Sequence, residues 1–233
     1  MSANLAPDWE YYYHSGRLPG SSRVSQQARR RVFERFLEVM RPQPSDRVLD
    51  LGATSDAIRP ESNFFERLYP YKSQVVCAGK EDASHLERLY PGTAFTRVTP
   101  GAPLPFATRH FDIVFSNAVV EHVGPPADQA AFLAEALRVA RRFFIVTPNR
   151  WFPLETHTGL PLVHYCPPRV FRSLLRLTPL SYWASEQHLN LLSVRSMRRL
   201  FPAATDVTVE HSGIGFVPAA SNLIAYGSTT ANA

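Results

Sequence analysis

The sequence is poor in cysteine, low in charge and without a long apolar run. It has two cysteines among 233 residues, and 19% of its residues are charged. Two cysteines cannot form the disulfide framework of a small secreted domain, and neither has a second cysteine at metal-ligand spacing. The start of the chain lacks the basic and apolar regions of a secretory signal, and no stretch approaches the ~20 apolar residues of a spanning helix. We therefore expect a globular cytoplasmic protein.

Glycine is also scarce, with 11 glycines against 20 prolines. A nucleotide-binding α/β protein normally has several glycines in its phosphate-binding loop, so this count is mild evidence against nucleotide binding. The rest of the composition is that of a folded protein, because 45% of the residues are hydrophobic and the formal net charge is only +5. It excludes a disordered chain and a collagen.

Short apolar runs alternate with amphipathic stretches along most of the chain. The runs predict strands at Arg47–Leu51, Gln74–Ala78, Ala94–Val98, Phe111–Ser116, Phe143–Thr147, Val207–His211 and Asn222–Tyr226. The amphipathic stretches predict helices at Ser25–Met40, Ser62–Leu68, Ala83–Tyr90 and Asp128–Ala140. Strands that alternate with helices indicate a parallel sheet covered on both faces, with the two late strands as an antiparallel addition.

Ligands of such a sheet bind beyond the carboxyl ends of its strands. Asp50 and Gly52 follow the first strand, where the glycine allows a sharp turn that places main-chain N–H groups beside a ligand. Glu81 and Asp82 follow the second strand, where a carboxylate can hold the two hydroxyls of an adenosine ribose. Each of these two segments, taken alone, is equally compatible with an ordinary turn.

A third segment is more specific. Leu104-Pro105-Phe106 precedes FDIVFSNAVVEHV, residues 111–123. Together with VLDLG (48–52) and GKED (79–82), it resembles the class I S-adenosylmethionine-dependent methyltransferases over Val48–Asn149. The resemblance implies an α/β, Rossmann-like class I methyltransferase fold, a seven-stranded and mostly parallel sheet with helices on both faces and an antiparallel last strand. It also implies S-adenosylmethionine as the cofactor.

The resemblance assigns roles to individual residues. Asp50 and Gly52 would line the methionine part of the cofactor, and Glu81 would hold its ribose hydroxyls. Ser116 and Asn117 would lie beside the sulfonium and the acceptor. The other expected cofactor-binding residues are Ala53, Thr54, Asp82 and Gly101.

The sequence departs from the family pattern in the cofactor loop. Thr54 and Asp56 stand at the second and third glycine positions. A left-handed backbone there would cost roughly 1–2 kcal/mol, so either the loop takes another path or cofactor binding is weak. Pro100 replaces the acidic residue that can reach the adenine amino group, which leaves backbone groups and shape to hold the adenine.

A long loop follows the fifth strand over the expected site. Residues 147–164, TPNRWFPLETHTGLPLVH, are rich in proline and aromatics and are typical of a lid or acceptor pocket. They resemble a bacterial methyltransferase subgroup that also has TSD in its cofactor loop and a following SN, here Ser62-Asn63. The substrate candidates are Glu121, Asn149, Arg150 and Trp151.

Histidines supply the candidate bases. Glu121 and His122 match the Glu-His pair of the family, although helix capping explains that pair equally well. A neutral His122 or His157 could take the proton of a hydroxyl acceptor, but methyl transfer depends mostly on positioning and can proceed without a base. No metal is expected from Glu155, His157 and His164, because Pro161 breaks any helical register between the histidines.

Two basic stretches lie near the end of the chain, in residues 169–177 and 195–199. They are compatible with solvated helix faces or with peripheral contact with an anionic surface. No nucleic-acid partner is expected, because the basic residues are dispersed and no recognised motif accompanies them. The sequence does not indicate an oligomeric state.

We expect one methyltransferase domain over residues 1–233. Its parts would be an N-terminal segment and helix (1–45), the cofactor-binding core (46–149), an acceptor loop with helices (150–200) and the C-terminal strands (201–233). The expected reaction is O-methylation of a small-molecule or glycan-like acceptor. The alternatives are a non-catalytic binding protein of the same fold and a nicotinamide-dependent oxidoreductase, which would require Gly-x-Gly-x-x-Gly after the first strand.

Overall fold

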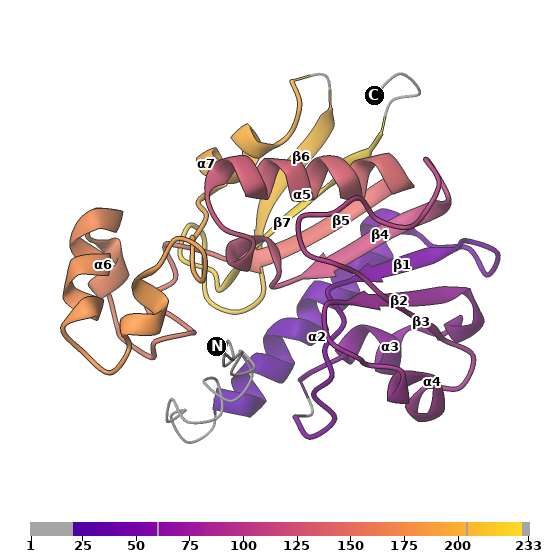
Figure 1. The fold of residues 1–233 in the computed structure, drawn as a ribbon, viewed down its shortest axis with the longest axis horizontal. Helices are drawn as coiled ribbons and strands as arrows, with labels where there is room; N and C mark the ends of the chain where they lie inside the picture. Colours follow the sequence, from indigo (N-terminus) through magenta and orange to yellow (C-terminus); the bar gives the residue numbers. More distant parts are fainter. Residues whose placement is uncertain (1–20, 60, 204, 230–233) are drawn as a thin grey trace, which may run out of the picture.

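A computed structural model describes residues 21–59, 61–203 and 205–229. The start of the expected 1–45 segment therefore lies outside the described residues. The described chain forms one seven-stranded sheet with the strand order β3-β2-β1-β4-β5-β7-β6 (Figure 1). The strands are β1 (Val48–Leu51), β2 (Val75–Gly79), β3 (Ala94–Arg97), β4 (Phe111–Asn117), β5 (Ala140–Pro148), β6 (Asp206–Ser212) and β7 (Asn222–Ser228).

The sheet has the mixed topology that the sequence resemblance implied. Strands β1 to β5 pair in parallel, and β7 pairs antiparallel with both β5 and β6. All seven strands occur where the apolar runs predicted them. The largest difference is that β5 begins three residues early, because α5 ends at Val139 and the chain becomes extended at Ala140 without a loop. The predicted class I methyltransferase fold is confirmed.

Helices cover both faces of the sheet (Figure 1). The helices α2 (Ser21–Met40), α3 (Phe64–Leu68) and α4 (His85–Leu89) pack on one face, and α5 (Pro126–Val139) and α7 (Val194–Leu200) pack on the other. The helix α6 (Pro168–Arg176) lies apart, beyond the carboxyl ends of β4 and β5. Short 3-10 helices are η1 (Lys72–Gln74), η2 (Val120–His122), η3 (Val163–Tyr165) and η4 (Ser181–Ala184).

The core on the α2 side is built from closely packed aromatic rings. Phe36 is completely buried and its ring lies 5.3–5.6 Å, centroid to centroid, from those of Phe65, Phe115 and Phe144. These rings meet edge to face, which is a favoured aromatic geometry. Phe36 therefore joins α2 to α3 and to two central strands.

A smaller hydrophobic cluster holds α6 and η4 together. It consists of Phe171, Leu175, Trp183, Ala184 and Leu189. This cluster stands beside the carboxyl edge of the sheet rather than on either face, so it can position the loop that follows β5. Among the described helices, none has the length and apolarity that crossing a bilayer demands.

The Phe36→Ala substitution is expected to lower the free energy of unfolding by about 3–5 kcal/mol, because it leaves a cavity among four elements. Urea denaturation followed by circular dichroism measures the change. The adjacent Leu37 is 37% exposed, so Leu37→Ala is the matched control and should cost less than about 1 kcal/mol. Equal losses for the two variants would contradict the central role of Phe36.

Candidate active site

The loop after β1 makes very close contact with two neighbouring segments. Gly52 has a φ of +117°, and a Cβ atom there would lie 2.1 Å from Cγ2 of Val119. Its N–H and that of Ala53 both donate to the carbonyl oxygen of Ala78 in β2, at 2.8 and 3.0 Å. A Cβ atom at Gly79 would lie 2.3 Å from the carbonyl oxygen of Ala53. Glycine is therefore required at both positions, at Gly52 because of its positive φ and the side chain of Val119, and at Gly79 because the backbone of Ala53 passes so closely.

The amide of Asn63 holds the part of this loop that lacks the family glycines. Its Oδ1 accepts from the N–H of Thr54 at 3.0 Å, and its Nδ2 donates to the carbonyl oxygens of Thr54 and Asp56 at 2.9 and 3.2 Å. Asn63 is itself left-handed, with a φ of 48°, whereas neither Thr54 nor Asp56 has a positive φ. The loop thus takes another path, which was one of the two outcomes left open by the sequence.

The side chain of Asp56 organises the turn that leads into α3. Its carboxylate accepts from the N–H groups of Ile58 and Arg59 at 2.9 and 3.2 Å and from the hydroxyl of Ser62 at 2.8 Å. The Ser62-Asn63 pair therefore contacts both departures from the glycine pattern. Side-chain hydrogen bonds therefore hold this loop in a conformation that does not need glycine at these two positions.

Two acidic side chains are buried together beneath the loop. Asp50 is 6% exposed, and its charge environment is set by Glu66, which is completely buried. The thiol of Cys77 donates to Oε1 of Glu66 at 3.3 Å. Burial and the charge of Glu66 raise the pKa of Asp50 well above its usual value. Asp50 therefore holds its proton more tightly than an exposed aspartate does.

The acidic residues after β2 have different surroundings. The hydroxyl of Ser55 donates to Oε2 of the half-buried Glu81 at 2.5 Å, so this carboxylate faces the cofactor loop. The exposed Asp82 accepts from the N–H of Ser84 at 2.9 Å, which is a contact at the start of α4. Gly101 is exposed, and no atom lies within 4 Å of where its Cβ would be. Of these three expected residues, Glu81 alone has a side chain that contacts the loop.

The end of β4 is tied to the end of β1. The buried hydroxyl of Ser116 donates to the carbonyl oxygen of Leu51 at 2.6 Å, and Asn117 is half-buried at the last position of the strand. Ala118 then takes a left-handed conformation with a φ of 56°. This turn leads into η2, which carries Glu121 and His122.

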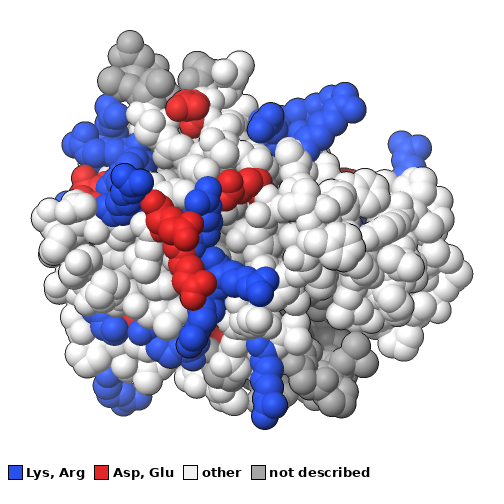
Figure 2. All heavy atoms as spheres, turned by 180° about the vertical axis from the view of Figure 1, so that it is seen from behind, with Lys and Arg blue, Asp and Glu red and all other residues white. Residues whose placement is uncertain are grey.

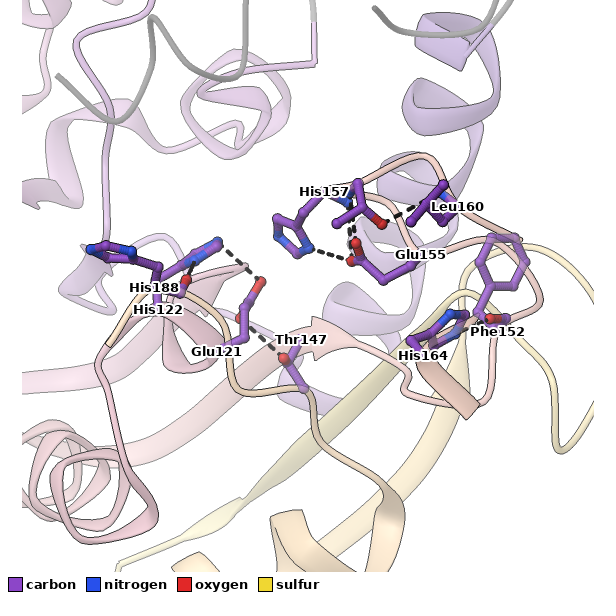
Figure 3. A network of polar contacts seen from close by, with 10 residues as sticks. Glu121, His122, Thr147, Phe152, Glu155, His157, Leu160, His164 and His188 are labelled. Carbon is purple, nitrogen blue, oxygen red and sulfur yellow. Dashed lines mark hydrogen bonds and ion pairs between the residues drawn. The ribbon is translucent and has the colours of Figure 1, made fainter. Parts of the chain in front are cut away.

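Glu121, His122 and His157 come together at the carboxyl edge (Figure 3). Glu121 is completely buried, and its Oε2 accepts from the hydroxyl of Thr147 at 3.0 Å. Its Oε1 lies 3.9 Å from Nε2 of His122 and has no hydrogen-bond partner among the described residues. Burial raises the pKa of Glu121 to about 7, against the lowering effects of His157 and of the bond from Thr147. The ring of His157 meets that of His122 edge to face, with centroids 4.8 Å apart.

Glu155 orients His157 from the other side. Its Oε1 accepts from Nδ1 of His157 at 2.6 Å, and its Oε2 accepts from the N–H of Thr158, also at 2.6 Å. Burial alone would raise the pKa of Glu155, but His157 and these hydrogen bonds outweigh burial and lower it to about 2. His122 is held similarly, because its Nδ1 donates to the carbonyl oxygen of His188 at 2.7 Å. Trp183 lies against both imidazole rings.

The other loop residues contact the fold instead of this cluster. His164 donates from Nε2 to the carbonyl oxygen of Phe152 at 2.8 Å, so the two loop histidines do not converge (Figure 3). The amide of Asn149 donates to the carbonyl oxygens of Pro218 and Ala220, at 2.9 and 2.8 Å. Asn149, Arg150 and Trp151 are the loop residues that were expected to contact substrate. The amide of Asn149 instead forms hydrogen bonds within the fold.

Arg150 and Trp151 follow Asn149 in the loop and are held by contacts with nearby residues. Arg150 donates to the carbonyl oxygen of Cys166 at 2.7 Å, and its guanidinium stacks over the ring of Trp151 at 5.6 Å. Trp151 is 40% exposed and packs edge-on against Tyr165. An exposed indole here remains compatible with acceptor contact.

Several contacts of this cluster were not foreseen from the sequence. Thr147 and Glu155 come from the end of β5 and the loop after it, and Trp183 and the carbonyl of His188 come from η4 and the residues that follow it. The Glu-x-His spacing of Glu155 and His157 was the only local signal, because residues two apart in a turn can share a hydrogen bond. The remaining contacts are long-range and leave no pattern in the sequence.

The basic residues do not form one continuous surface on the face shown in Figure 2, where Lys and Arg alternate with acidic residues and a broad area carries neither. Arg172 of α6 pairs with Glu186 at 2.8 Å. Together with Arg169 and Arg176, it lines a groove of about 700 Å³ between α6 and η4. Contact with an anionic surface stays a prediction.

The chain is similar to known methyltransferases in sequence profile and in fold. Residues 24–212 match a family described as a methyltransferase domain. A protein from Pyrococcus horikoshii is 15% identical with a TM-score of 0.59, covering 95% of this chain and 99% of its own. An S-adenosylmethionine-dependent methyltransferase from Thermotoga maritima, described as a possible histamine N-methyltransferase, is 13% identical with a TM-score of 0.54, covering 89% and 91%.

A third structure is the N-terminal domain of EvdMO1 in the presence of S-adenosylhomocysteine and D-fucose. It is 16% identical with a TM-score of 0.51, covering 89% of this chain and 83% of its own. At these identities the solved structures show a common fold. A comparison with curated proteins finds no match.

The buried Asp50–Glu66 pair is expected to make stability depend on pH. Asp50 keeps its proton in the folded chain at pH values where it is ionised in the unfolded chain, because its folded pKa is raised. The folded chain therefore binds more protons, and the free energy of unfolding should fall as pH rises above about 4, by at most ~1.4 kcal/mol per pH unit for this proton.

Urea denaturation at a series of pH values from about 4 upward measures this slope. Glu66→Gln keeps an oxygen that can accept a hydrogen bond and removes the neighbouring charge, so its slope should be shallower. The exposed Glu34→Gln on α2 is the matched control and should keep the wild-type slope. An unchanged slope in Glu66→Gln would show that the charge of Glu66 does not raise the pKa of Asp50.

Proposed function

Because the chain belongs to the methyltransferase domain family, we propose that it transfers a methyl group from S-adenosylmethionine to a hydroxyl of a small-molecule or glycan-like acceptor. S-adenosylmethionine, when bound, supplies an electrophilic methyl group on a sulfonium. The protein must then hold that sulfonium, bring the acceptor oxygen into line and deal with the proton of the hydroxyl. The arrangement of His157, Glu155, His122 and Glu121 at the carboxyl edge carries the proposal.

The residues at the carboxyl edge fit the cofactor. The backbone of Gly52 and Ala53 is held against β2 by two hydrogen bonds to the carbonyl oxygen of Ala78, which fixes the turn at the carboxyl edge of the sheet. Glu81 faces this loop and has two acceptor oxygens, which suit the two hydroxyls of a ribose. Gly52 to Thr54 would contact the methionine part, and Ser116 and Asn117 would adjoin the sulfonium. Asn63 maintains the shape of the loop in place of the missing glycines.

The pairing of His157 with Glu155 suits a hydroxyl acceptor. A carboxylate only accepts hydrogen bonds, so Nδ1 of His157 carries the hydrogen and Nε2 carries the lone pair. The ionised, buried Glu155 stabilises the imidazolium that forms when Nε2 takes a proton. A positioned base of this kind assists a hydroxyl, whose proton must leave as the methyl group arrives.

The surroundings of the cluster are consistent with a ring-shaped acceptor. Trp183 covers the two imidazole rings from the α6 side, and Trp151 presents an exposed indole in the loop after β5. The C–H face of a sugar ring can stack on an indole, which is why the acceptor class includes glycans. The acceptor loop would thus combine an apolar wall with a buried base.

Calorimetric titration with S-adenosylhomocysteine tests the cofactor site. The wild-type chain is expected to bind in the micromolar range, and Glu81→Ala should weaken binding by roughly 10–100-fold, the loss of hydrogen bonds to a charged group. Asp82→Asn is the matched control, since Asp82 is the adjacent acid and contacts only the start of α4. No binding by the wild-type chain would favour the non-catalytic alternative.

A labelled-methyl experiment tests the reaction itself. The full chain is incubated with S-adenosylmethionine that carries an isotopically labelled methyl group and with metabolite and glycan extracts of cells that lack the protein. Mass spectrometry is expected to find a labelled methyl ether, formed about 10²–10⁴-fold more slowly by His157→Ala. His164→Gln, which alters the other loop histidine, should react at nearly the wild-type rate. Label on nitrogen or carbon would overturn the proposed O-methylation.

A further inference from the structure

Three side chains at the carboxyl edge form a set of metal ligands. Glu121, His122 and His157 each offer one ligand atom, and these atoms lie within 4.8 Å of one another. We propose that they bind a divalent transition-metal ion of the Zn²⁺ or Fe²⁺ type. Two imidazoles and one carboxylate suit such ions, whereas Mg²⁺ and Ca²⁺ prefer oxygen ligands alone.

The contacts around the two histidines are those that support metal ligands. Nδ1 of His157 donates to the carboxylate of Glu155 at 2.6 Å, and Nδ1 of His122 donates to the carbonyl oxygen of His188 at 2.7 Å. A metal-bound histidine almost always donates its other N–H to a carboxylate or a carbonyl, which fixes the ring and the tautomer. Both histidines therefore present Nε2 as the ligand atom.

Glu121 supplies an independent observation. Its side chain is completely buried, its Oε2 accepts from Thr147, and its Oε1 has no hydrogen-bond partner among the described residues. A buried carboxylate oxygen without a partner is costly, because it has lost its hydration. Oε1 lies on the side of Nε2 of His122, 3.9 Å away (Figure 3). A cation between these atoms would compensate the buried charge.

The spacing of the ligand atoms requires only a small adjustment. Bonds of about 2.0–2.1 Å in a tetrahedral zinc site place the ligand atoms roughly 3.3 Å from one another. The separation of 3.9 Å between Glu121 and His122 and the limit of 4.8 Å for the set exceed this value by about 0.5–1.5 Å. Small side-chain rotations cover such a difference. The three protein ligands leave at least one position open, as in catalytic rather than structural sites.

A cation here would change how the acceptor is activated, a consequence that rests on the proposed function. A hydroxyl at the open position loses its proton more readily, because the cation stabilises the oxyanion. Nε2 of His157 cannot bind a cation and take a proton at the same time. In the loaded protein His157 is therefore a ligand, and the cation takes over the activation of the hydroxyl.

Metal binding is measured on the full chain without a polyhistidine tag, after treatment with a chelator and in the absence of cofactor and acceptor. Titration with Zn²⁺ by calorimetry and with Co²⁺ by visible absorption is expected to show one ion per chain. Glu121→Gln and His157→Ala should each weaken binding by at least about tenfold, and Glu155→Gln, which removes the carboxylate that orients His157, by about 10–100-fold. His164→Gln is the matched control and should bind as the wild type does.

Circular dichroism and thermal denaturation establish that each variant is folded. If a substitution at a buried residue prevents folding, His122→Ala is used in its place. Absence of saturable binding by the wild-type chain, or equal binding by Glu121→Gln and wild type, would overturn the metal site. Neither result bears on cofactor binding, which the S-adenosylhomocysteine titration reports separately. The chelator-treated chain also tests the role of the cation in the reaction. If it transfers methyl groups at the full rate although the chain binds the added ion, the cation does not activate the acceptor, and the metal site itself still stands.

Discussion

The close approach of the loop after β1 to the turn before η2 is the contact on which the carboxyl edge depends. At Gly52 no side chain fits, since a Cβ atom would lie 2.1 Å from the side chain of Val119. Val119 immediately precedes η2, so this contact places Glu121 and His122 beside the cofactor loop. The pairing of β4 with β5 then brings Thr147 to Glu121, and the following loop brings His157. One steric constraint thus sets the positions of groups from several segments.

The loss of two family glycines has a physical compensation in this chain. A glycine-rich loop is usually needed where the backbone takes positive φ values. Here Gly52 keeps such a value, but Thr54 and Asp56 do not, and the next residue with a positive φ is Asn63, outside the loop itself. Asparagine tolerates that conformation better than most residues, and its amide can bond to backbone groups on both sides. The low glycine content therefore reflects a different way of holding the loop, and it does not argue against a nucleotide cofactor.

Buried carboxyl groups are concentrated around the carboxyl edge. Asp50 and Glu66 lie beneath the loop after β1, Glu121 lies in η2, and Glu155 lies in the loop after β5. Burying such groups opposes folding unless each is protonated or paired, and the surroundings move the pKa of Glu121 and that of Glu155 in opposite directions. Shifted and divergent pKa values are characteristic of functional sites, where charge is placed for chemistry at a cost in stability.

The sequence alone determined the elements of the fold and their order, because apolar periodicity and turn residues act within a few positions. It also indicated Gly52, Glu81 and the Glu121–His122 pair through their places after predicted strands. Only the tertiary structure decided that Asn63 holds the loop, that Asn149 is committed to internal bonds, and that His157 reaches His122 while His164 turns to Phe152. These outcomes depend on where a long proline-containing loop packs against η2 and Trp183, and contacts between distant segments leave no periodic signal in the chain.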